Sequence, residues 1–255
     1  MSSRASLTHG PRTAIVTGAA KRIGAALARA LSADGWHLLI HYNRSADEAE
    51  ELAQALGNAR TVAAPLEVAD CGARIFAALD GLPPARLLVN NASRFAYDTA
   101  ESFGLAEWEL HQAINLRAPA LLSQAFAAAA GPAGGLIVNL LDAKLAAPNP
   151  DFFTYTVSKM GLAGLTELTA RAYAPAVRVC GIAPSVTLVS GPQSRDNFDA
   201  VHSLNALGRG VDVAEIVEAL RFLLATPTIT GQTITLDGGQ RFLGLPRDVQ
   251  FLEHP

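Results

Sequence analysis

Short apolar runs alternate with longer, alanine-rich stretches along most of the chain. The runs are rich in Val, Ile and Leu, and they lie at 13–17, 37–42, 61–66, 86–91, 135–141, 177–184 and 232–237. The stretches between them have helical periodicity, and the two long ones lie near 104–130 and 152–173. Strands that are apolar on both faces and separated by helices predict a parallel sheet that is covered on both sides. We therefore expect an α/β fold with a seven-stranded, doubly wound parallel sheet.

The length of the chain suits a single domain. Its 255 residues match one α/β core, which runs to roughly 250 residues. We expect this domain at 12–255, after a flexible tail at 1–11. Residues 185–210 form the one long stretch without clear periodicity. Because long loops in compact domains often cover a site, we expect this segment to be a substrate lid.

Composition excludes several classes of partner. Half of the residues are hydrophobic and the formal net charge is −3, which leaves no basic excess for binding nucleic acid. We find no signal-peptide pattern and no run of 18 uncharged apolar residues, so we expect a cytoplasmic protein that does not span a membrane. Cys71 and Cys180 lie far apart, and the six histidines show no paired spacing. We therefore expect no metal site.

The segment TAIVTGAAKRIG, residues 13–24, looks like a nucleotide-binding turn. Thr17 and Gly18 follow a strand, and Gly24 opens a helix, so backbone N–H groups and the helix dipole can point at a pyrophosphate. Lys21 and Arg22 stand where such turns usually carry glycines. These two cations add charge and hydrogen-bond donors beside the expected phosphates.

The end of the second predicted strand points to NADPH. NAD enzymes place a carboxylate there for the ribose hydroxyls, whereas this chain reads HYNRS and offers Arg44. An arginine suits a 2′-phosphate, and Lys21 is placed to share that phosphate. The alternative is that Arg44 is a solvated loop cation and that Ser45 caps a helix, with Glu48 completing a capping box.

Tyr155 and Lys159 form a candidate acid–base pair. They are four residues apart on a predicted helix, so both side chains project from one face. A neighbouring ammonium and a positively charged nicotinamide favour the phenolate, which predicts a pKa for Tyr155 below its usual value of about 10. The alternative is an ordinary amphipathic helix without a catalytic role.

Three signals in one order give the chain a family resemblance. The turn at 13–24, LLVNNAS at 87–93 and the Tyr155/Lys159 pair resemble the short-chain dehydrogenases/reductases over residues 12–243. The resemblance implies a Rossmann-type domain that carries both cofactor and catalysis. It also implies Asn115 as a supporting catalytic residue and a homotetramer that pairs through the long helices near 104–130 and 152–173.

A departure from the family pattern narrows the resemblance. Most members carry a serine thirteen residues before the tyrosine, where this chain has Asp142. With TGAAKRIG, HYNRS and NNAS followed by a phenylalanine, this aspartate resembles the pteridine reductases. The resemblance implies that Phe95 stacks a pterin against the nicotinamide, that Ser93 hydrogen-bonds the ring or the cofactor, and that Arg22 reaches over the phosphates toward the substrate.

Together these arguments assign residues to three roles. The catalytic set is Asn115, Asp142, Tyr155 and Lys159. The cofactor set is Gly18, Lys21, Arg22, Ile23, Gly24, Tyr42, Asn43, Arg44, Ser45, Glu67, Asn91, Ala92, Ser93, Tyr155, Lys159, Pro184, Ser185 and Val186. The substrate set is Arg22, Ser93, Phe95, Asp142 and Tyr155.

The expected reaction is reduction of a pterin by NADPH. Hydride goes to C6 of a 7,8-dihydropterin and a proton goes to N5, and reduction of oxidised pterins or of dihydrofolate is a possible extension. One alternative is a general carbonyl or 3-oxoacyl reductase, which a serine in place of Asp142 would have favoured. A second alternative is a non-catalytic protein that binds NADPH.

Overall fold

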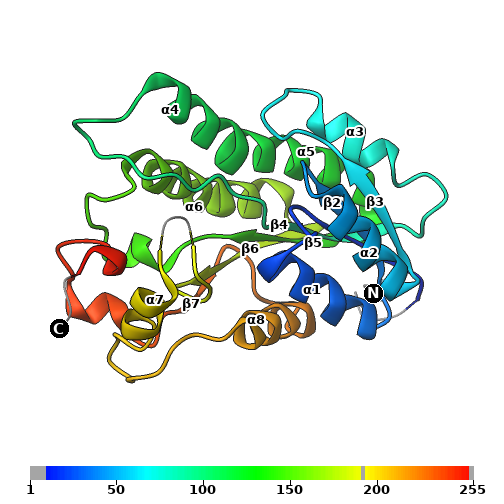
Figure 1. Cartoon of the computed structure of the whole chain (residues 1–255). Helices are drawn as coiled ribbons and strands as arrows, with labels where there is room; N and C mark the ends of the chain where they lie inside the picture. The colour runs from blue at the N-terminus through cyan, green and yellow to red at the C-terminus, as the bar shows by residue number, and fades with distance from the viewer. Residues whose placement is uncertain (1–9, 191–192, 253–255) are drawn as a thin grey trace.

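The computed structural model describes residues 10–190 and 193–252, and in this part of the chain seven parallel strands form one sheet (Figure 1). The strand order is β3-β2-β1-β4-β5-β6-β7. The strands are β1 (Thr13–Val16), β2 (His37–Tyr42), β3 (Ala59–Ala63), β4 (Ala85–Asn90), β5 (Gly135–Leu140), β6 (Val177–Pro184) and β7 (Thr233–Leu236). The predicted doubly wound, Rossmann-type α/β fold is confirmed.

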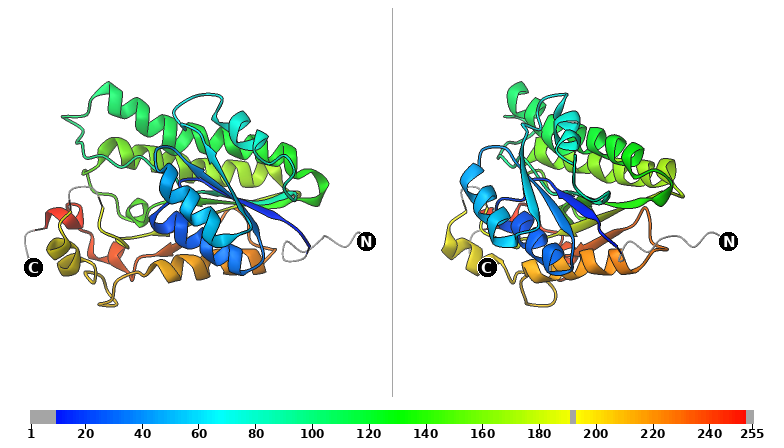
Figure 2. Two further views of the ribbon diagram at one scale, coloured as in Figure 1. Left: turned by 45° about the vertical axis from the view of Figure 1, so that its right-hand side comes forward. Right: turned by 90° about the vertical axis from the view of Figure 1, so that its right-hand side faces the viewer.

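Helices cover both faces of the sheet, as the two rotated views show (Figure 2). One core lies between the sheet and α1, α2 and α8, and a second lies on the opposite face beneath α3, α5 and α6. The helices are α1 (Arg22–Ala33), α2 (Ala46–Leu56), α3 (Cys71–Ala77), α4 (Leu105–Gln112), α5 (Ala118–Ala130), α6 (Phe153–Tyr173), α7 (Arg195–Val201) and α8 (Val213–Ala225). No helix among the described residues is both long enough and apolar enough to cross a membrane.

Three elements differ from the sequence-based expectation. The third strand ends at Ala63 instead of residue 66, because the backbone N–H of Ala64 makes its last bond to β2. The long helix near 104–130 is divided by a π-helical turn, η1 (Ala113–Arg117). Residues 185–210 contain helix α7, so this segment is not one continuous loop. Most of the predicted tail at 1–11 lies outside the described residues.

The strand order reverses between β1 and β4, and polar groups at this point fix the cofactor turn. Thr17 follows β1, and its Oγ1 accepts hydrogen bonds from the backbone N–H groups of Asn91 and Ala92, both at 3.0 Å. The side-chain amide of Asn91 donates to the carbonyl oxygens of Thr17 at 2.8 Å and Gly18 at 3.1 Å. Ligands bind at such reversal points in doubly wound sheets. These hydrogen bonds therefore fix the turn after β1 to the segment after β4 at the place where a ligand is expected.

A buried histidine supports the same turn from below. The N–H of Gly18 donates to Nδ1 of His41 at 3.0 Å, and Nε2 of His41 lies 2.7 Å from the carbonyl oxygen of Ala64. This pattern requires the neutral tautomer with its proton on Nε2. Burial lowers the pKa of His41, so the ring stays neutral and the turn stays fixed to β2.

Gly24 has no room for a side chain. A Cβ at this position would lie 2.3 Å from the carbonyl oxygen of Gly18 and 2.7 Å from Nδ2 of Asn91. Gly18 has a φ of 61°, a left-handed conformation that favours glycine. Arg22 has a φ of 57°, which is costly for a residue with a Cβ. The turn is therefore both tightly packed and strained.

We predict that Gly24→Ala destabilises the protein by about 1–3 kcal/mol, because the added methyl group forces the turn away from Asn91. The free energy of unfolding in urea measures this. Gly72→Ala is the matched control, since its Cβ would meet the carbonyl oxygen of Leu121 at an ordinary 3.8 Å. Equal stability of the two variants would contradict the packing argument.

Candidate active site

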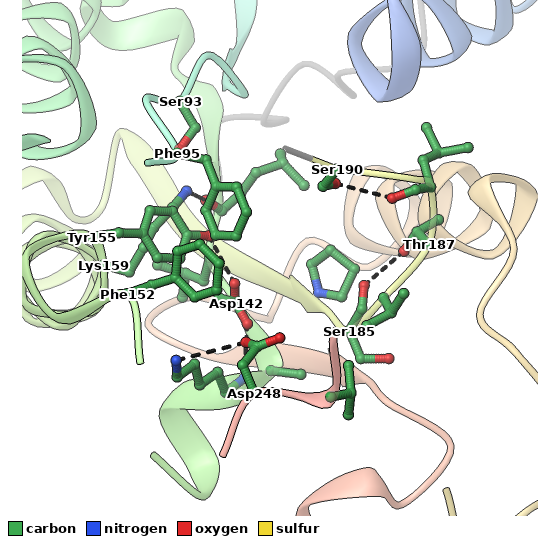
Figure 3. A pocket seen from close by; sticks show the side chains of 18 of the residues that line it. Ser93, Phe95, Asp142, Phe152, Tyr155, Lys159, Ser185, Thr187, Ser190 and Asp248 are labelled. Atoms are coloured by element: carbon green, nitrogen blue, oxygen red, sulfur yellow. Dashed lines mark hydrogen bonds and ion pairs between the residues drawn. The ribbon is translucent and has the colours of Figure 1, made fainter. Parts of the chain in front are cut away.

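A cavity of about 670 Å³ opens at the carboxyl edge of the sheet. Its wall comes from the segments that follow β1, β4, β5 and β6, from the start of α6, and from the C-terminal segment after β7. Figure 3 shows side chains from these elements facing a common space. The wall includes these predicted site residues: Lys21, Arg22, Ile23, Gly24, Asn91, Ala92, Ser93, Phe95, Asp142, Tyr155, Lys159, Pro184, Ser185 and Val186.

Asp142 and Tyr155 are joined by a hydrogen bond in this cavity (Figure 3). The Tyr155 hydroxyl donates to Oδ2 of Asp142 at 2.7 Å. The other carboxylate oxygen, Oδ1, accepts the backbone N–H of Lys144 at 2.8 Å and so caps the short helix η3 (Ala143–Ala146). The N–H of Lys144 therefore holds the Asp142 carboxylate in one orientation, in which Oδ2 faces the phenol.

The pKa of Tyr155 is raised well above its usual value, which corrects the expectation of a lowered pKa. Burial has the largest effect, and the negative charge and hydrogen bond of Asp142 add to it. The sequence argument counted the Lys159 ammonium and a bound, positively charged nicotinamide, but it did not count the Asp142 carboxylate that accepts a hydrogen bond from the phenol. Tyr155 is thus held as a neutral phenol, which suits a proton donor.

Lys159 lies behind the tyrosine ring. Its Nζ donates to the carbonyl oxygen of Leu140 at 2.7 Å and lies 5.7 Å from the centre of the Tyr155 ring. Burial lowers the pKa of Lys159 to about 8, although Asp142 acts in the opposite direction. The ammonium is therefore the main form at neutral pH and becomes neutral under mildly alkaline conditions.

A chain of buried polar residues fixes the start of α6. The N–H of Thr154 donates to Oδ1 of Asp98 at 3.0 Å, and its hydroxyl donates to Oδ2 of the same carboxylate. Nδ1 of His111 lies 2.7 Å from Oγ1 of Thr154, and the three side chains are almost fully buried. Since Tyr155 is the next residue, these hydrogen bonds set the position of the phenol.

Asn115 lies behind the wall of the cavity. Its side-chain amide donates to the carbonyl oxygen of Arg94 at 3.0 Å and to the hydroxyl of Ser158 at 2.9 Å, and its oxygen accepts the N–H of Arg94 at 2.8 Å. The residue is 1 % exposed and lies in the π-helical turn η1. Its side chain thus links the loop after β4 to α6, and a supporting catalytic role stays a prediction.

Phe95 forms one side of the expected substrate site. Its ring stacks on Phe152 at 4.3 Å between centroids and meets Tyr155 edge-on at 4.8 Å. Ser93 lies nearby, with its hydroxyl 3.2 Å from Oδ1 of Asn115. An aromatic face and a proton donor thus line the same cavity.

Arg22 reaches across the mouth of the cavity. Its guanidinium donates to the carbonyl oxygen of Val189 at 2.7 Å and to the hydroxyl of Ser190 at 3.0 Å. These partners belong to the segment that follows β6. The arginine therefore connects the cofactor turn to the segment that we expected to be a lid.

Several predicted cofactor residues do not line the cavity itself. Gly18 lies within the turn, and the side chains that follow β2 or β3 lie further along the sheet edge: Tyr42, Asn43, Arg44, Ser45 and Glu67. Lys21 pairs with Glu48 at 2.5 Å, and Ser45 occupies the N-cap of α2 without a side-chain hydrogen bond, so the alternative of a capping box at Ser45 is wrong. No ion pair involves Arg44 within the described ranges.

The residues around the cavity mouth fit the cofactor NADPH. Gly24 lets the turn pack directly against Gly18 and Asn91, which brings the start of α1 and its N–H groups to the wall of the cavity. Exposed Arg44 and Lys21 lie at the ends of β2 and β1, where a 2′-phosphate is recognised. No group of three or more metal-binding side chains occurs in the described part of the chain.

Sequence reasoning did not find the C-terminal part of the wall. Leu245, Arg247, Asp248 and Gln250 line the cavity together with Lys144. The short segment that carries them has no periodicity and no glycine-rich motif, so only the folded chain brings it to the site.

Asp151 attaches this segment to the start of α6. Its carboxylate accepts two hydrogen bonds from the guanidinium of Arg247, at 2.9 and 3.2 Å, and one from the N–H of Asp248 at 2.8 Å. Asp151 is only 3 % exposed. The burial of Asp151 is visible only in the folded chain, so the letters PDFF alone offer no signal for this wall.

Comparison with known proteins places this chain in a family. Residues 18–241 match a family model described as "Enoyl-(Acyl carrier protein) reductase". The chain is 30% identical to pteridine reductase 1 of Leishmania tarentolae, over 89% of this chain and 95% of the relative. It is 31% identical to a putative ketoacyl reductase 2 of the granaticin polyketide synthase from Streptomyces violaceoruber, over 90% and 96% of the two chains.

A solved structure is similar over nearly the whole chain. It is FolM alternative dihydrofolate reductase 1 from Brucella canis in complex with NADP, with 38% identity and a TM-score of 0.89. The match covers 93% of this chain and 96% of that one. With the family model matching most of the sequence, the chain belongs to the short-chain dehydrogenase/reductase family, as its motifs implied.

Proposed function

We propose that this enzyme reduces a pterin with NADPH. In the reaction, hydride is added to C6 of a 7,8-dihydropterin and a proton is added to N5, which gives a tetrahydropterin and NADP⁺. The same site would reduce an oxidised pterin by adding hydride to C7 and a proton to N8. Bound NADPH supplies the hydride, and the residues of the chain bind, orient and protonate the substrate.

The observation that carries this proposal is the Asp142–Tyr155 hydrogen bond beside the ring of Phe95. A carboxylate accepts hydrogen bonds and, when ionised, donates none, so Asp142 matches the N–H groups of an amino-substituted ring better than a ketone oxygen. The Tyr155 phenol, held 2.7 Å from that carboxylate, is the proton donor for N5. Phe95 supplies a flat apolar face for the heterocycle.

The remaining predicted residues have supporting tasks in this proposal. Lys159 orients the nicotinamide ribose, and Ser93 and Arg22 contact the pterin edge and the phosphates. Asn115 maintains the loop that carries Ser93. The homotetramer also stays a prediction. The exposed side chains of Leu105 on α4 and Leu168 on α6 lie on the helices expected to pair.

The relatives favour a pterin over a ketone without deciding between them. The Brucella protein and the Leishmania reductase are named for dihydrofolate and pteridine reduction, whereas the Streptomyces relative is named for ketoacyl reduction. NADP in the Brucella structure agrees with a cation at the end of β2 in this chain. A general carbonyl reductase is therefore the alternative that the experiments must exclude.

We predict that the purified enzyme oxidises NADPH with dihydrobiopterin, dihydromonapterin or dihydrofolate. Turnover of simple ketones alone would reject the pterin assignment.

Tyr155→Phe removes the proton donor, so kcat should fall at least about a hundredfold, while the Kd for NADPH stays close to that of the unaltered enzyme. Full activity of this variant would exclude Tyr155 as the acid.

We predict that Arg44→Ala weakens NADPH binding about ten- to hundredfold and leaves NADH binding nearly unchanged, because a charged hydrogen bond to the 2′-phosphate is lost. Fluorescence titration with both cofactors measures this. Arg29→Ala removes an exposed arginine on α1 and serves as the control. Equal loss for the two cofactors would mean that Arg44 does not read the phosphate.

We predict an alkaline limb in the pH profile of kcat/KM with an apparent pKa of about 8, the value to which burial lowers the pKa of Lys159. Lys159 is an ammonium below this pH and loses its charge above it, so activity falls as pH rises. Tyr155 does not produce this limb, because its own pKa lies well above the usual value. In Lys144→Gln the limb should keep its position; a shifted limb would assign it to Lys144.

A further inference from the structure

The C-terminal segment closes the end of the cavity that lies beyond the catalytic pair. Figure 3 shows Ser93 and Phe95 on one side of Tyr155 and Asp142, and Asp248 on the other. All five residues line the same cavity. The cavity therefore continues past Tyr155 and Asp142 to Asp248, which leaves room there for a substituent of a flat substrate that lies against Phe95.

The carboxylate of Asp248 has hydrogen-bonding capacity to spare. Its Oδ1 accepts only the N–H of Gln250, at 3.3 Å. Its Oδ2 lies 3.7 Å from Nζ of Lys144, too far for a hydrogen bond, and accepts none from any residue in the described ranges. The side chain is 22% exposed, and it lines the cavity. It is thus a fixed acceptor that faces the substrate space.

The cations around this acceptor already have anionic partners. Arg247 pairs with Asp151 at 2.9 Å, and Arg241 pairs with Asp237 at 2.8 Å. Lys144 donates to the main-chain oxygen of Asp151 and lies near Asp248 itself. Each cation at this end thus has an acidic neighbour, and Asp248, 3.7 Å from Lys144, is the one of these acids that accepts no side-chain hydrogen bond among the described residues.

We propose that Asp248 is a specificity-determining residue that accepts hydrogen bonds from hydroxyl groups on the C6 side chain of the pterin. The inference rests on the proposed pterin reductase function and adds which side chain the site selects. Vicinal hydroxyls can donate to the two oxygens of one carboxylate, whereas a carboxylate-bearing side chain is repelled. The enzyme then prefers a hydroxylated dihydropterin to dihydrofolate.

The anchoring of the segment supports this role. Asp151 holds both the side chain of Arg247 and the backbone of Asp248, and the ring of Phe251 lies 5.9 Å from that of Phe152 in a stacked arrangement. Phe152 in turn stacks on Phe95. Asp248 is therefore fixed relative to the aromatic face of the substrate site, as specificity requires.

The test compares three substrates in Asp248→Asn. For dihydromonapterin, which carries hydroxyl groups, we expect KM to rise about ten- to hundredfold. For 6-methyl-7,8-dihydropterin, which has none, KM should change less than about twofold, and for dihydrofolate KM should fall, because the repelling charge is gone. The asparagine oxygen can still accept the N–H of Gln250, so the local turn is kept.

Controls separate this proposal from folding and from the proposed function. Asp248→Ser, which also retains an acceptor for the turn, should show the same pattern, and Asp80→Asn, an exposed acid after α3, should show no change. NADPH affinity verifies that each variant is folded. An equal KM change for all three substrates, or no change, overturns the role of Asp248. If the unaltered enzyme turns over no pterin, the proposed function fails and this inference fails with it.

Discussion

The hydrogen bond between Tyr155 and Asp142 connects the two halves of the site. Asp142 follows β5 and is fixed by the N–H of Lys144, whereas Tyr155 lies in the first turn of α6. Because the carboxylate accepts the phenolic proton and raises the pKa of the phenol, it keeps Tyr155 in its acid form. In the function that we propose, this carboxylate also accepts hydrogen bonds from the N–H groups of the substrate.

The start of α6 must be rigid for this hydrogen bond to be useful. Asp98, Thr154 and His111 form a buried polar chain there, and an isolated buried carboxylate would be costly without such partners. On the other side of Tyr155, the rings of Phe95 and Phe152 stack, and Phe152 has a φ of 53°. Strained backbone at a residue next to a site persists where surrounding contacts hold it, and the aromatic stack supplies those contacts.

Much of this could be predicted from the sequence, for a physical reason. Strand and helix positions follow from apolar periodicity, which is a local property, so all seven strands were predicted and their ends lie within three residues of the prediction, the third strand differing most. The residues at strand ends converge because the strands are parallel. The charge pairs could not be predicted in this way. Lys21 meets Glu48, and Asp142 raises the pKa of Tyr155, through contacts between elements whose distance depends on the packed structure.

The C-terminal wall of the cavity also depends on charge pairs between elements that are distant in the sequence. Arg241, Arg247 and Lys144 line this wall, and each has an acidic partner in the folded chain. In the specificity that we propose, the lone pairs left on Asp248 select the substrate. A site that hydrogen-bonds a substrate hydroxyl with a buried polar group discriminates strongly against analogues that lack the hydroxyl. With such an analogue bound, the polar group of the site is left unpaired. In our proposal, selectivity thus arises from the unfilled acceptor of Asp248 in a wall whose cations all have acidic partners.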